Sequence, residues 1–263
     1  MLVSKHLKTL DTILSLITGG ALWELLKSVV PEFKDRFDRY LQARKELYSH
    51  IDPILKASDE LYGKILSLSK EDFNTFINPE NSNSENVAQN KLYIYYLFAQ
   101  FWAQLERFRI KNQYYSISRF KKGRQLLLFL ETFESRSFRL LDRPVQRIIG
   151  ELLIEHSTTN FNVMSLSQFS NYLESSESNI KLWISQLENK MMATSEKAER
   201  QRVLLYGTIM ALLINHFDSK SKMIRKRKIY WNKLSINSKE LMKNVLLKKY
   251  IHFISTSDFE LKD

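Results

Sequence analysis

Basic residues concentrated near the C-terminus are the part of this sequence best able to engage a partner chemically. Residues 220–249 hold eleven Lys or Arg and one acid, which gives this C-terminal basic region a net charge of +10 out of +11 for the whole chain. Such a concentration of cations favours a partner with dense negative charge. We expect the region to bind that partner through the following side chains: Lys220, Lys222, Arg225, Lys226, Arg227, Lys228, Trp231, Lys233, Lys243, Lys248 and Lys249.

Two kinds of anionic partner fit the C-terminal basic region. On a nucleic acid, the cations would contact phosphates while Tyr230, Trp231 and Tyr250 stack on bases. On an anionic membrane, the same side chains would lie at the headgroups, where each cation contributes about 1 kcal/mol. A third interpretation is a solvated surface that keeps the protein soluble. The sequence leaves these alternatives open.

Common catalytic and cofactor-binding motifs are missing from the sequence. Neither GxxxxGK(S/T) nor GxGxxG occurs, and there is no HExxH and no GxSxG. The five His are dispersed, and the lack of Cys excludes disulfides and thiolate ligands. His156 and His216 are expected at helix C-termini, where the helix dipole favours a partly charged imidazole. We therefore expect no cofactor, no metal site and no enzymatic activity.

One spacing nevertheless permits catalysis. Arg44 and His50 are separated as in an R-x(4–6)-H motif, within the segment RKELYSH. The segment resembles the motif of HEPN ribonucleases, in which Arg and His of a helical dimer cleave RNA without a metal ion. That resemblance implies a base near the 2′-hydroxyl and a cation on the phosphate. It covers seven residues only, and Lys45 stands where the family has Asn, Asp or His.

The N-terminal region contains an apolar run. Residues 12–23 are uninterrupted by charge, and this run of 12 residues is shorter than the roughly 20 of a clean transmembrane helix. It fits a short or tilted membrane anchor, an interfacial amphipathic helix, or an ordinary core helix. If it touches a membrane, the contacting side chains are Ile13, Leu14, Leu16, Ile17, Leu22 and Trp23.

Composition predicts an all-α fold. Gly and Pro number only 6 and 4 in 263 residues, whereas β-rich folds need many turn residues. Residues 92–105 are almost wholly apolar, with Gln100 and Gln104 as the conventionally polar exceptions, and a helix apolar all round is buried. We therefore predict an irregular multi-helix bundle whose buried central helix spans about residues 90–109. Three parts are expected: an apolar N-terminal helix (1–31), a helical bundle domain (32–217) and a basic amphipathic C-terminal segment (218–263).

Local signals suggest where helices begin and end. Pro31 and Pro53 indicate a break or kink, and Ser69 followed by Asp72 resembles a capping box. Residues 78–89 have the composition of a loop. In the C-terminal segment, Ser238 is expected to open an amphipathic helix that reaches about Ile254.

Another helix start is predicted at Asp142-Arg143-Pro144, with Asp142 as the N-cap. This helix is expected to reach about Glu155. It carries a stripe of charges at four-residue steps, which we interpret as surface ion pairs rather than as a polar seam facing a ligand. The stripe consists of Arg143, Arg147, Glu151 and Glu155.

Two stretches together resemble a family of uncharacterised bacterial helical proteins. Residues 92–109 are similar to its LYxLxQFxAxxE pattern, and residues 138–154 to its FRxxxxQRxIGELLI block, from which Pro144 departs. The likeness covers roughly residues 25–228. It implies a helical architecture with an N-terminal membrane segment, and it implies no activity.

The sequence favours a non-enzymatic, membrane-associated helical accessory or effector protein that self-associates and serves a defence-type role. We expect it in the bacterial cytoplasm, at the inner face of the cell membrane. The expected partners are an anionic membrane surface or a nucleic acid, and a second copy of the chain. The alternatives are a nucleic-acid-binding helical module that uses the basic region, and a HEPN-like metal-independent ribonuclease.

Overall fold

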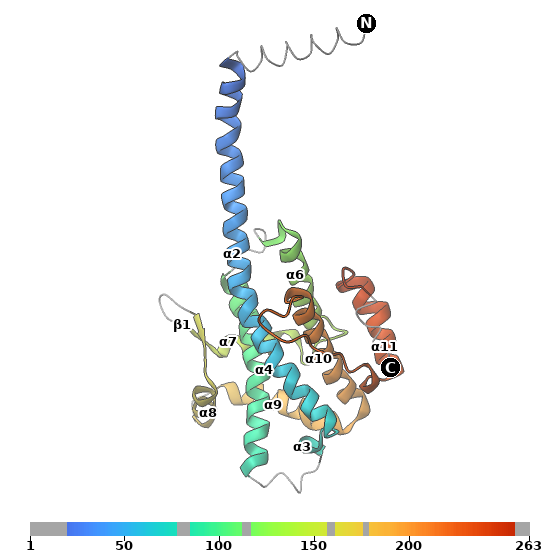
Figure 1. Cartoon of the computed structure of the whole chain (residues 1–263). Helices are drawn as coiled ribbons and strands as arrows, with labels where there is room; N and C mark the ends of the chain where they lie inside the picture. The colour runs from blue at the N-terminus through green and yellow to red at the C-terminus, as the bar shows by residue number, and fades with distance from the viewer. Residues whose placement is uncertain (1–19, 78–84, 112–116, 157–160, 176–178, 256–263) are drawn as a thin grey trace. The chain divides into compact units, whose positions relative to one another are not determined.

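The computed structural model describes residues 20–77, 85–111, 117–156, 161–175 and 179–255. Helices make up most of these segments, and the β structure within them is limited to two strands of three residues each (Figure 1). The predicted all-α class is confirmed. Its cause is local, because strong helix formers fill long stretches that few Gly or Pro residues interrupt.

The chain divides into two compact units, residues 1–48 and 49–263. The described part of the first unit, residues 20–48, is helical and belongs to helix α2, Gly20–Lys70. The second unit contains the end of α2 and all the other described elements. They are α3 Asn74–Ile77, α4 Glu85–Lys111, α6 Lys121–Glu134, α7 Arg143–Leu152, β1 Ile154–His156, β2 Phe161–Val163, α8 Leu166–Glu174, α9 Ile180–Met192, α10 Lys197–Phe217 and α11 Ile236–Leu241, with short 3₁₀ turns at Ala193–Ser195 and Trp231–Lys233 and a π-helix at Met242–Tyr250.

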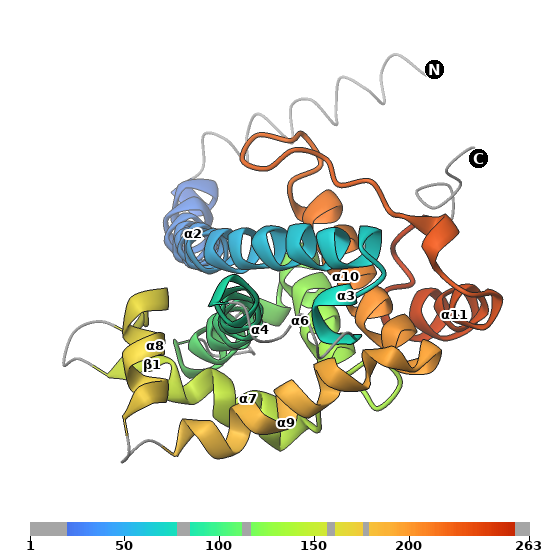
Figure 2. The same cartoon turned by 90° about the horizontal axis from the view of Figure 1, so that it is seen from below.

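Helix α4 is the centre of the second unit, as its apolar sequence predicts. It packs against α7, α8, α9 and β2, and Figure 2 shows these elements arranged around it. Almost every side chain from Ile94 to Leu105 is buried. Trp102 donates a hydrogen bond from Nε1 to the hydroxyl of Tyr206 on α10 at 2.8 Å, so the polar atoms of two buried rings satisfy each other.

The buried stretch of α4 contains polar atoms as well as apolar side chains. Within the described part of the chain, the Oε1 atom of Gln100 is buried without a hydrogen-bond partner, as is the hydroxyl of Tyr95. The helix is thus buried mainly through apolar packing, which outweighs the cost of leaving these two atoms unpaired.

The proline signals were wrong as helix boundaries, because α2 includes both Pro31 and Pro53. Around Pro53, the buried side chains of Ile51, Ile54 and Leu55 compensate for the backbone hydrogen bond that proline cannot make. The capping box at Ser69 was also wrong. Ser69 lies in the last turn of α2, and the chain then reverses through Asp72 and Phe73, whose φ angles are 47° and 61°.

The helix predicted from Asp142 begins as expected but ends early. Helix α7 spans Arg143–Leu152 with Asp142 at the N-cap, although the Asp142 side chain makes no capping bond and pairs with Arg139 instead. The predicted extension to Glu155 was wrong, because β1 pairs with β2 in an antiparallel hairpin whose register matches Ile154 with Val163. Glu155 therefore leaves the predicted charge stripe, and its carboxylate accepts a hydrogen bond from Gln168 at 2.7 Å.

The C-terminal helix starts three residues earlier than predicted. Ser235 is the N-cap of α11, and its hydroxyl accepts a hydrogen bond from the backbone of Ser238. After α11 the chain forms the π-helix and bonds five residues back, with the backbone N–H of Ile251 donating to the carbonyl of Leu246 at 2.9 Å. The buried residues of the π-helix are Met242, Leu246 and Leu247, and Ile251 and Ile254 just after it are buried as well.

Candidate functional site

The segment between α10 and α11, residues 219–235, carries the densest positive charge and is here called the basic strap. Its start is held by Asp218, whose carboxylate accepts hydrogen bonds from the backbone N–H groups of Lys222, Met223 and Ile224 at 2.8, 2.9 and 2.7 Å. Burial opposes the charged form of this carboxyl, but the three donors prevail and lower the pKa of Asp218. The strap is therefore anchored by a carboxylate that stays ionised.

The middle of the strap is held by side chains of α10 and α2. The Asn215 amide donates to the carbonyl of Arg227 at 2.8 Å and accepts from its N–H at 2.9 Å. The guanidinium of Arg227 pairs with Asp59, and the hydroxyl of Tyr62 donates to the carbonyl of Lys228. The hydrogen bond to Asp59 raises the pKa of Arg227. Arg227, a predicted binding residue, is thus engaged in fixing the strap.

The remaining cations of the strap point into solvent. Ile224, Ile229 and Leu234 are buried and act as apolar anchors. Apart from Arg227, the cationic side chains before and between these anchors are exposed and form no ion pair with any described residue. These are Lys220, Lys222, Arg225, Lys226, Lys228 and Lys233. A fixed backbone therefore presents six of the predicted binding residues together.

Apolar side chains are exposed among these cations. Met223 and Tyr230 are 39% and 38% exposed, and Ile236, the first residue of α11, is 75% exposed. Trp231 differs from them, because it is half-buried and the ammonium of Lys239 lies 5.6 Å from the centre of its ring. The strap thus combines positive charge with solvent-exposed apolar surface.

The other predicted cations lie on the π-helix. Lys243, Lys248 and Lys249 are exposed, and Lys248 donates to the side chain of Asn244 at 3.0 Å. The rings of Tyr250 and Phe138 pack in a T-shaped arrangement with their centres 5.9 Å apart, which fixes this helix to the bundle. Tyr250 is therefore a packing residue, whereas the three lysines extend the cationic surface.

The membrane-contact prediction lies almost wholly beyond what the structure describes. Ile13, Leu14, Leu16 and Ile17 lie outside the described residues, and for Leu22 and Trp23 the structure describes the helical backbone only. No helix in the described ranges combines the length and apolarity needed to cross a bilayer.

The two residues of the ribonuclease motif have packing partners of their own. The guanidinium of Arg44 lies 5.7 Å from the centre of the Tyr48 ring, in the first unit. The rings of His50 and Phe108, both in the second unit, pack in a T-shaped arrangement with their centres 6.0 Å apart. These contacts account for both residue types without a reaction, and RNA cleavage stays an untested prediction.

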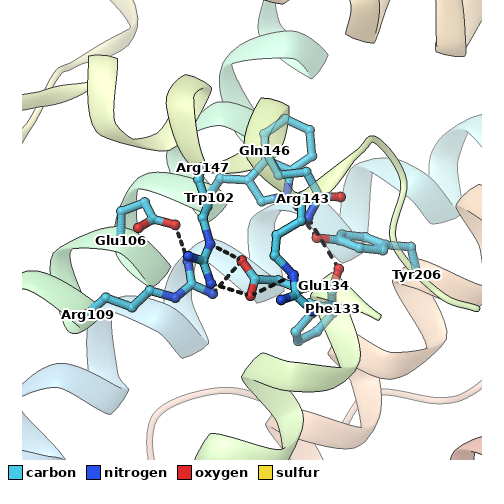
Figure 3. Close-up of polar contacts among 9 residues, drawn as sticks. All are labelled: Trp102, Glu106, Arg109, Phe133, Glu134, Arg143, Gln146, Arg147 and Tyr206. Atoms are coloured by element: carbon cyan, nitrogen blue, oxygen red, sulfur yellow. Dashed lines mark hydrogen bonds and ion pairs between the residues drawn. The ribbon is translucent and has the colours of Figure 1, made fainter. Parts of the chain in front are cut away.

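A buried ionic cluster in the second unit escaped the sequence analysis. The Glu134 carboxylate at the end of α6 lies among three guanidinium groups from α4 and α7 (Figure 3). Arg147 donates two hydrogen bonds to the carboxylate oxygens, from Nε at 2.8 Å and from Nη2 at 2.9 Å. The nearest nitrogen of Arg109 lies 2.8 Å from a carboxylate oxygen, and that of Arg143 lies 3.7 Å away. The Glu134 side chain is only 7% exposed, so its charge is compensated by these partners.

This cluster is a structural junction rather than a binding site. The gap lined by Trp102, Glu106, Arg109, Glu134 and Gln146 has a volume of ≈ 0 Å³ for a water-sized molecule. Burial raises the pKa of Glu106, although its partner Arg109 opposes that shift. The predicted charge stripe was right in that Arg143 and Arg147 form ion pairs. It was wrong about their partner, which is the buried Glu134 on another helix and not an acid on the surface of α7. The available signal was Glu134, an acid that directly follows the largely apolar stretch 125–133.

His216 lies in the last turn of α10, as predicted, but the surroundings of its imidazole differ from the expectation. Its Nε2 atom lies 3.0 Å from Oε1 of Gln125 and 3.3 Å from Nζ of Lys122. Burial first, and then the charges of Lys122 and Lys121, lower its pKa to about 4. The expected charged imidazole at the end of α10 was thus wrong, since desolvation outweighs the helix dipole.

Within the described segments, no group of three or more His, Cys, Asp or Glu side chains is arranged to hold a metal ion. No family model, curated protein or solved structure matches this chain.

Proposed function

We propose that this protein is a non-enzymatic helical protein that binds the surface of an anionic membrane through its basic strap. The supporting observation is that exposed Met223 and Tyr230 accompany exposed cations on the strap, and that exposed Ile236 directly follows it. A membrane interface accommodates both kinds of side chain, because apolar groups enter the headgroup boundary while cations meet anionic lipids. A nucleic acid would engage the cations and the Tyr230 ring but would offer little to Met223 and Ile236.

The proposal places the protein at the cytoplasmic face of the bacterial cell membrane. That leaflet is the anionic one, and its surface potential attracts basic segments close to it. The strap does not require a transmembrane segment for this interaction. It requires only that its cations and apolar side chains reach the headgroups together.

Sedimentation of the full-length protein with lipid vesicles tests the proposal. We expect binding to vesicles of phosphatidylcholine mixed with phosphatidylserine, weak binding to phosphatidylcholine alone, and release by salt. Each cation contributes about 1 kcal/mol, so replacing four of them with Gln should weaken binding by roughly two to three orders of magnitude. The four are Lys220, Lys222, Arg225 and Lys226, which are exposed and free of ion pairs with described residues.

A matched control removes four charges elsewhere on the second unit. Lys56, Lys70, Arg136 and Lys181 are exposed, and replacing them with Gln gives the same net charge as the strap variant. We expect this control to retain most vesicle binding. Equal losses in both variants would show a response to overall charge and would reject the strap as the site.

The same two variants separate the nucleic-acid alternative. Fluorescence anisotropy with single-stranded RNA and duplex DNA measures that interaction directly. If the wild type binds nucleic acid tightly, ignores the anionic vesicles and loses nucleic-acid binding only in the strap variant, the nucleic-acid module is the correct function.

We further propose that the protein self-associates through the first unit. Val30, Phe37, Leu41 and Tyr48 are separated by seven, four and seven residues, which places them on one face of α2. These side chains are 54%, 51%, 43% and 42% exposed. An exposed apolar stripe with this spacing suits a second copy of the same helix.

A further inference from the structure

A small polar pocket lies in the second unit, on the face of α10 that meets the end of α2. It has a volume of ≈ 200 Å³. Three regions of the chain line it: the end of α2 with the turn that follows it, the first two turns of α10, and the basic strap. The lining residues are Ser69, Asp72, Phe73, Lys197, Arg200, Gln201, Leu204 and Lys233.

The pocket carries an excess of positive charge. Lys197, Arg200 and Lys233 face a single acid, Asp72, which leaves a net charge of +2. No ion pair joins Asp72 to any of these three cations, all four being described residues. The pocket therefore lacks an internal counter-ion for two of its positive charges.

One lining residue of the pocket has a buried donor that is unsatisfied. The Nε atom of Arg200 has no hydrogen-bond partner among the described residues, although it is shielded from solvent. The same guanidinium is held in place through Nη2, which donates to the carbonyl of Ser195 at 3.2 Å. A buried guanidinium N–H without an acceptor costs free energy that a bound anion would recover.

The walls of the pocket are held by contacts of their own. The Gln201 amide donates to the carbonyl of Lys233 at 3.0 Å and accepts from the N–H of Ser235 at 2.7 Å, which fixes Lys233 beside α10. Phe73, another lining residue, is 1% exposed, and its N–H donates to the carbonyl of Leu68 at 2.8 Å. The backbone at Lys233 and at Phe73 is thus fixed before any ligand arrives.

From this cavity, its charge and its unsatisfied donor, we propose that the pocket binds a compact phosphate-type dianion. The net charge of +2 in the pocket would balance the charge of −2 on such a ligand. Lys197 and Lys233 supply point charges, and Arg200 supplies a directed N–H donor. The ≈ 200 Å³ volume is below the roughly 300–1,000 Å³ of sites for larger ligands, which favours inorganic phosphate or a small phosphomonoester over a nucleotide. A lipid phosphomonoester headgroup has the same chemistry.

Isothermal titration of the full-length protein with sodium phosphate, at constant ionic strength, tests the proposal. We expect saturable binding that weakens at least tenfold in Lys197→Gln and in Arg200→Gln. Asp72→Asn should tighten binding severalfold, because it removes the repelling charge while Asn tolerates the positive φ of 47° at this position. Arg136→Gln, an exposed cation outside the pocket, should change the affinity less than twofold. Thermal unfolding of each variant checks that it is folded.

Three results would overturn the proposal: no saturable phosphate binding by the wild type, a loss in Arg136→Gln equal to that in the pocket variants, or weaker binding by Asp72→Asn. Competition by phosphatidylcholine vesicles that contain phosphatidic acid distinguishes the two sources of the phosphate group. If they displace inorganic phosphate, the ligand is a lipid headgroup, and otherwise it is a soluble phosphate.

The pocket proposal can fail independently of the membrane proposal. The strap variant, with Gln at residues 220, 222, 225 and 226, leaves every pocket residue in place. It should keep its phosphate affinity while losing binding to phosphatidylserine vesicles.

Discussion

At the scale of single residues, the most consequential side chain is one that sequence analysis passed over. Glu134 ends an apolar helix and compensates three arginines from two other helices. Its effect depends on burial, because a charge that is 7% exposed cannot rely on water for solvation. The neighbouring Gln146 acts in the same way without charge: its Oε1 accepts from the N–H groups of Leu140 and Leu141 at 3.0 and 3.1 Å.

Replacing Glu134 with Gln should destabilise the protein by about 2–3 kcal/mol, because three guanidinium groups lose their common anion. This is less than the cost for fully buried ions, since Arg143 and Arg147 are 49% and 44% exposed. Urea unfolding gives the free energy of unfolding of each variant. Glu131→Gln on the exposed side of the same helix is the control and should cost less than about 0.5 kcal/mol. Equal effects would mean that the cluster contributes nothing.

The shifted pKa of His216 should make stability fall as the solution is acidified. The unfolded chain takes up a proton near the ordinary pKa of 6.5, whereas the folded protein resists it down to about 4. Stability is therefore lost between these two values as pH falls. The loss should be about 1–2 kcal/mol after allowance for partial exposure to solvent.

Unfolding free energies at pH 7 and pH 4.5 measure this loss. His216→Gln should reduce the difference between the two pH values, while His252→Gln, at an exposed position, should leave it unchanged. A pH dependence that is the same in all three proteins would contradict the role of His216.

At the scale of elements, α4 and α7 pack backbone against backbone. A Cβ atom at Gly150 would lie 2.7 Å from the carbonyl oxygen of Trp102 and 3.0 Å from the backbone nitrogen of Ala103. Gly150 is required here by that close approach, not by its backbone angles. The small residue thus determines how near α7 lies to the central helix.

Gly150→Ala should destabilise the protein by about 1–3 kcal/mol, because the two helices must move apart. Gly63→Ala on α2 is the matched control, since its nearest atom beyond the local helix would lie at 4.0 Å. That change should stabilise the helix by about 0.5–1 kcal/mol. Thermal unfolding distinguishes the two, and a stabilised Gly150→Ala would show that the interface adapts freely.

The basic strap has little regular structure, so its order depends on a few polar anchors. Asn215→Ala removes both hydrogen bonds to the backbone of Arg227 and should cost about 1–2 kcal/mol. The strap of this variant should open locally more often, so trypsin should cleave faster within residues 220–228. Asn244→Ala, which removes an exposed asparagine of the π-helix, is the control. Unchanged strap cleavage in Asn215→Ala would show that Asp218 and Tyr62 suffice to hold it.

At the scale of the whole molecule, the two proposed association surfaces differ in their chemistry. The strap offers charge with scattered apolar groups, and the first unit offers an apolar stripe. These surfaces suit different partners, because headgroups are anionic whereas a second helix of the same kind is apolar.

Leu41→Lys should weaken self-association at least tenfold, because it places a charge in the middle of the stripe and removes a Leu worth about 1.5–3 kcal/mol on burial. Gln42→Lys adds the same side chain one position away, off the stripe, and should have little effect. Sedimentation velocity over a range of protein concentrations measures both. A wild type that stays monomeric throughout would reject the proposal.

Several features of this protein follow from the sequence alone. The sequence predicted the all-α class, the buried central helix and the start of α7. The signals for them act over a few neighbouring residues: apolar periodicity, scarce Gly and Pro, and the Asp-Arg-Pro signature. The excess of charge near the C-terminus is likewise a property of composition.

Tertiary structure decided which of those residues are available. It engaged Arg227 with Asp59, 168 positions away, and left Lys226 and Lys228 in solvent. It also ended α7 at a hairpin and formed the small polar pocket from the end of α2, the start of α10 and the strap. The physical reason is range: helix formation is governed by neighbours along the chain, whereas the partner of a charged side chain is set by which distant surfaces pack together and exclude water.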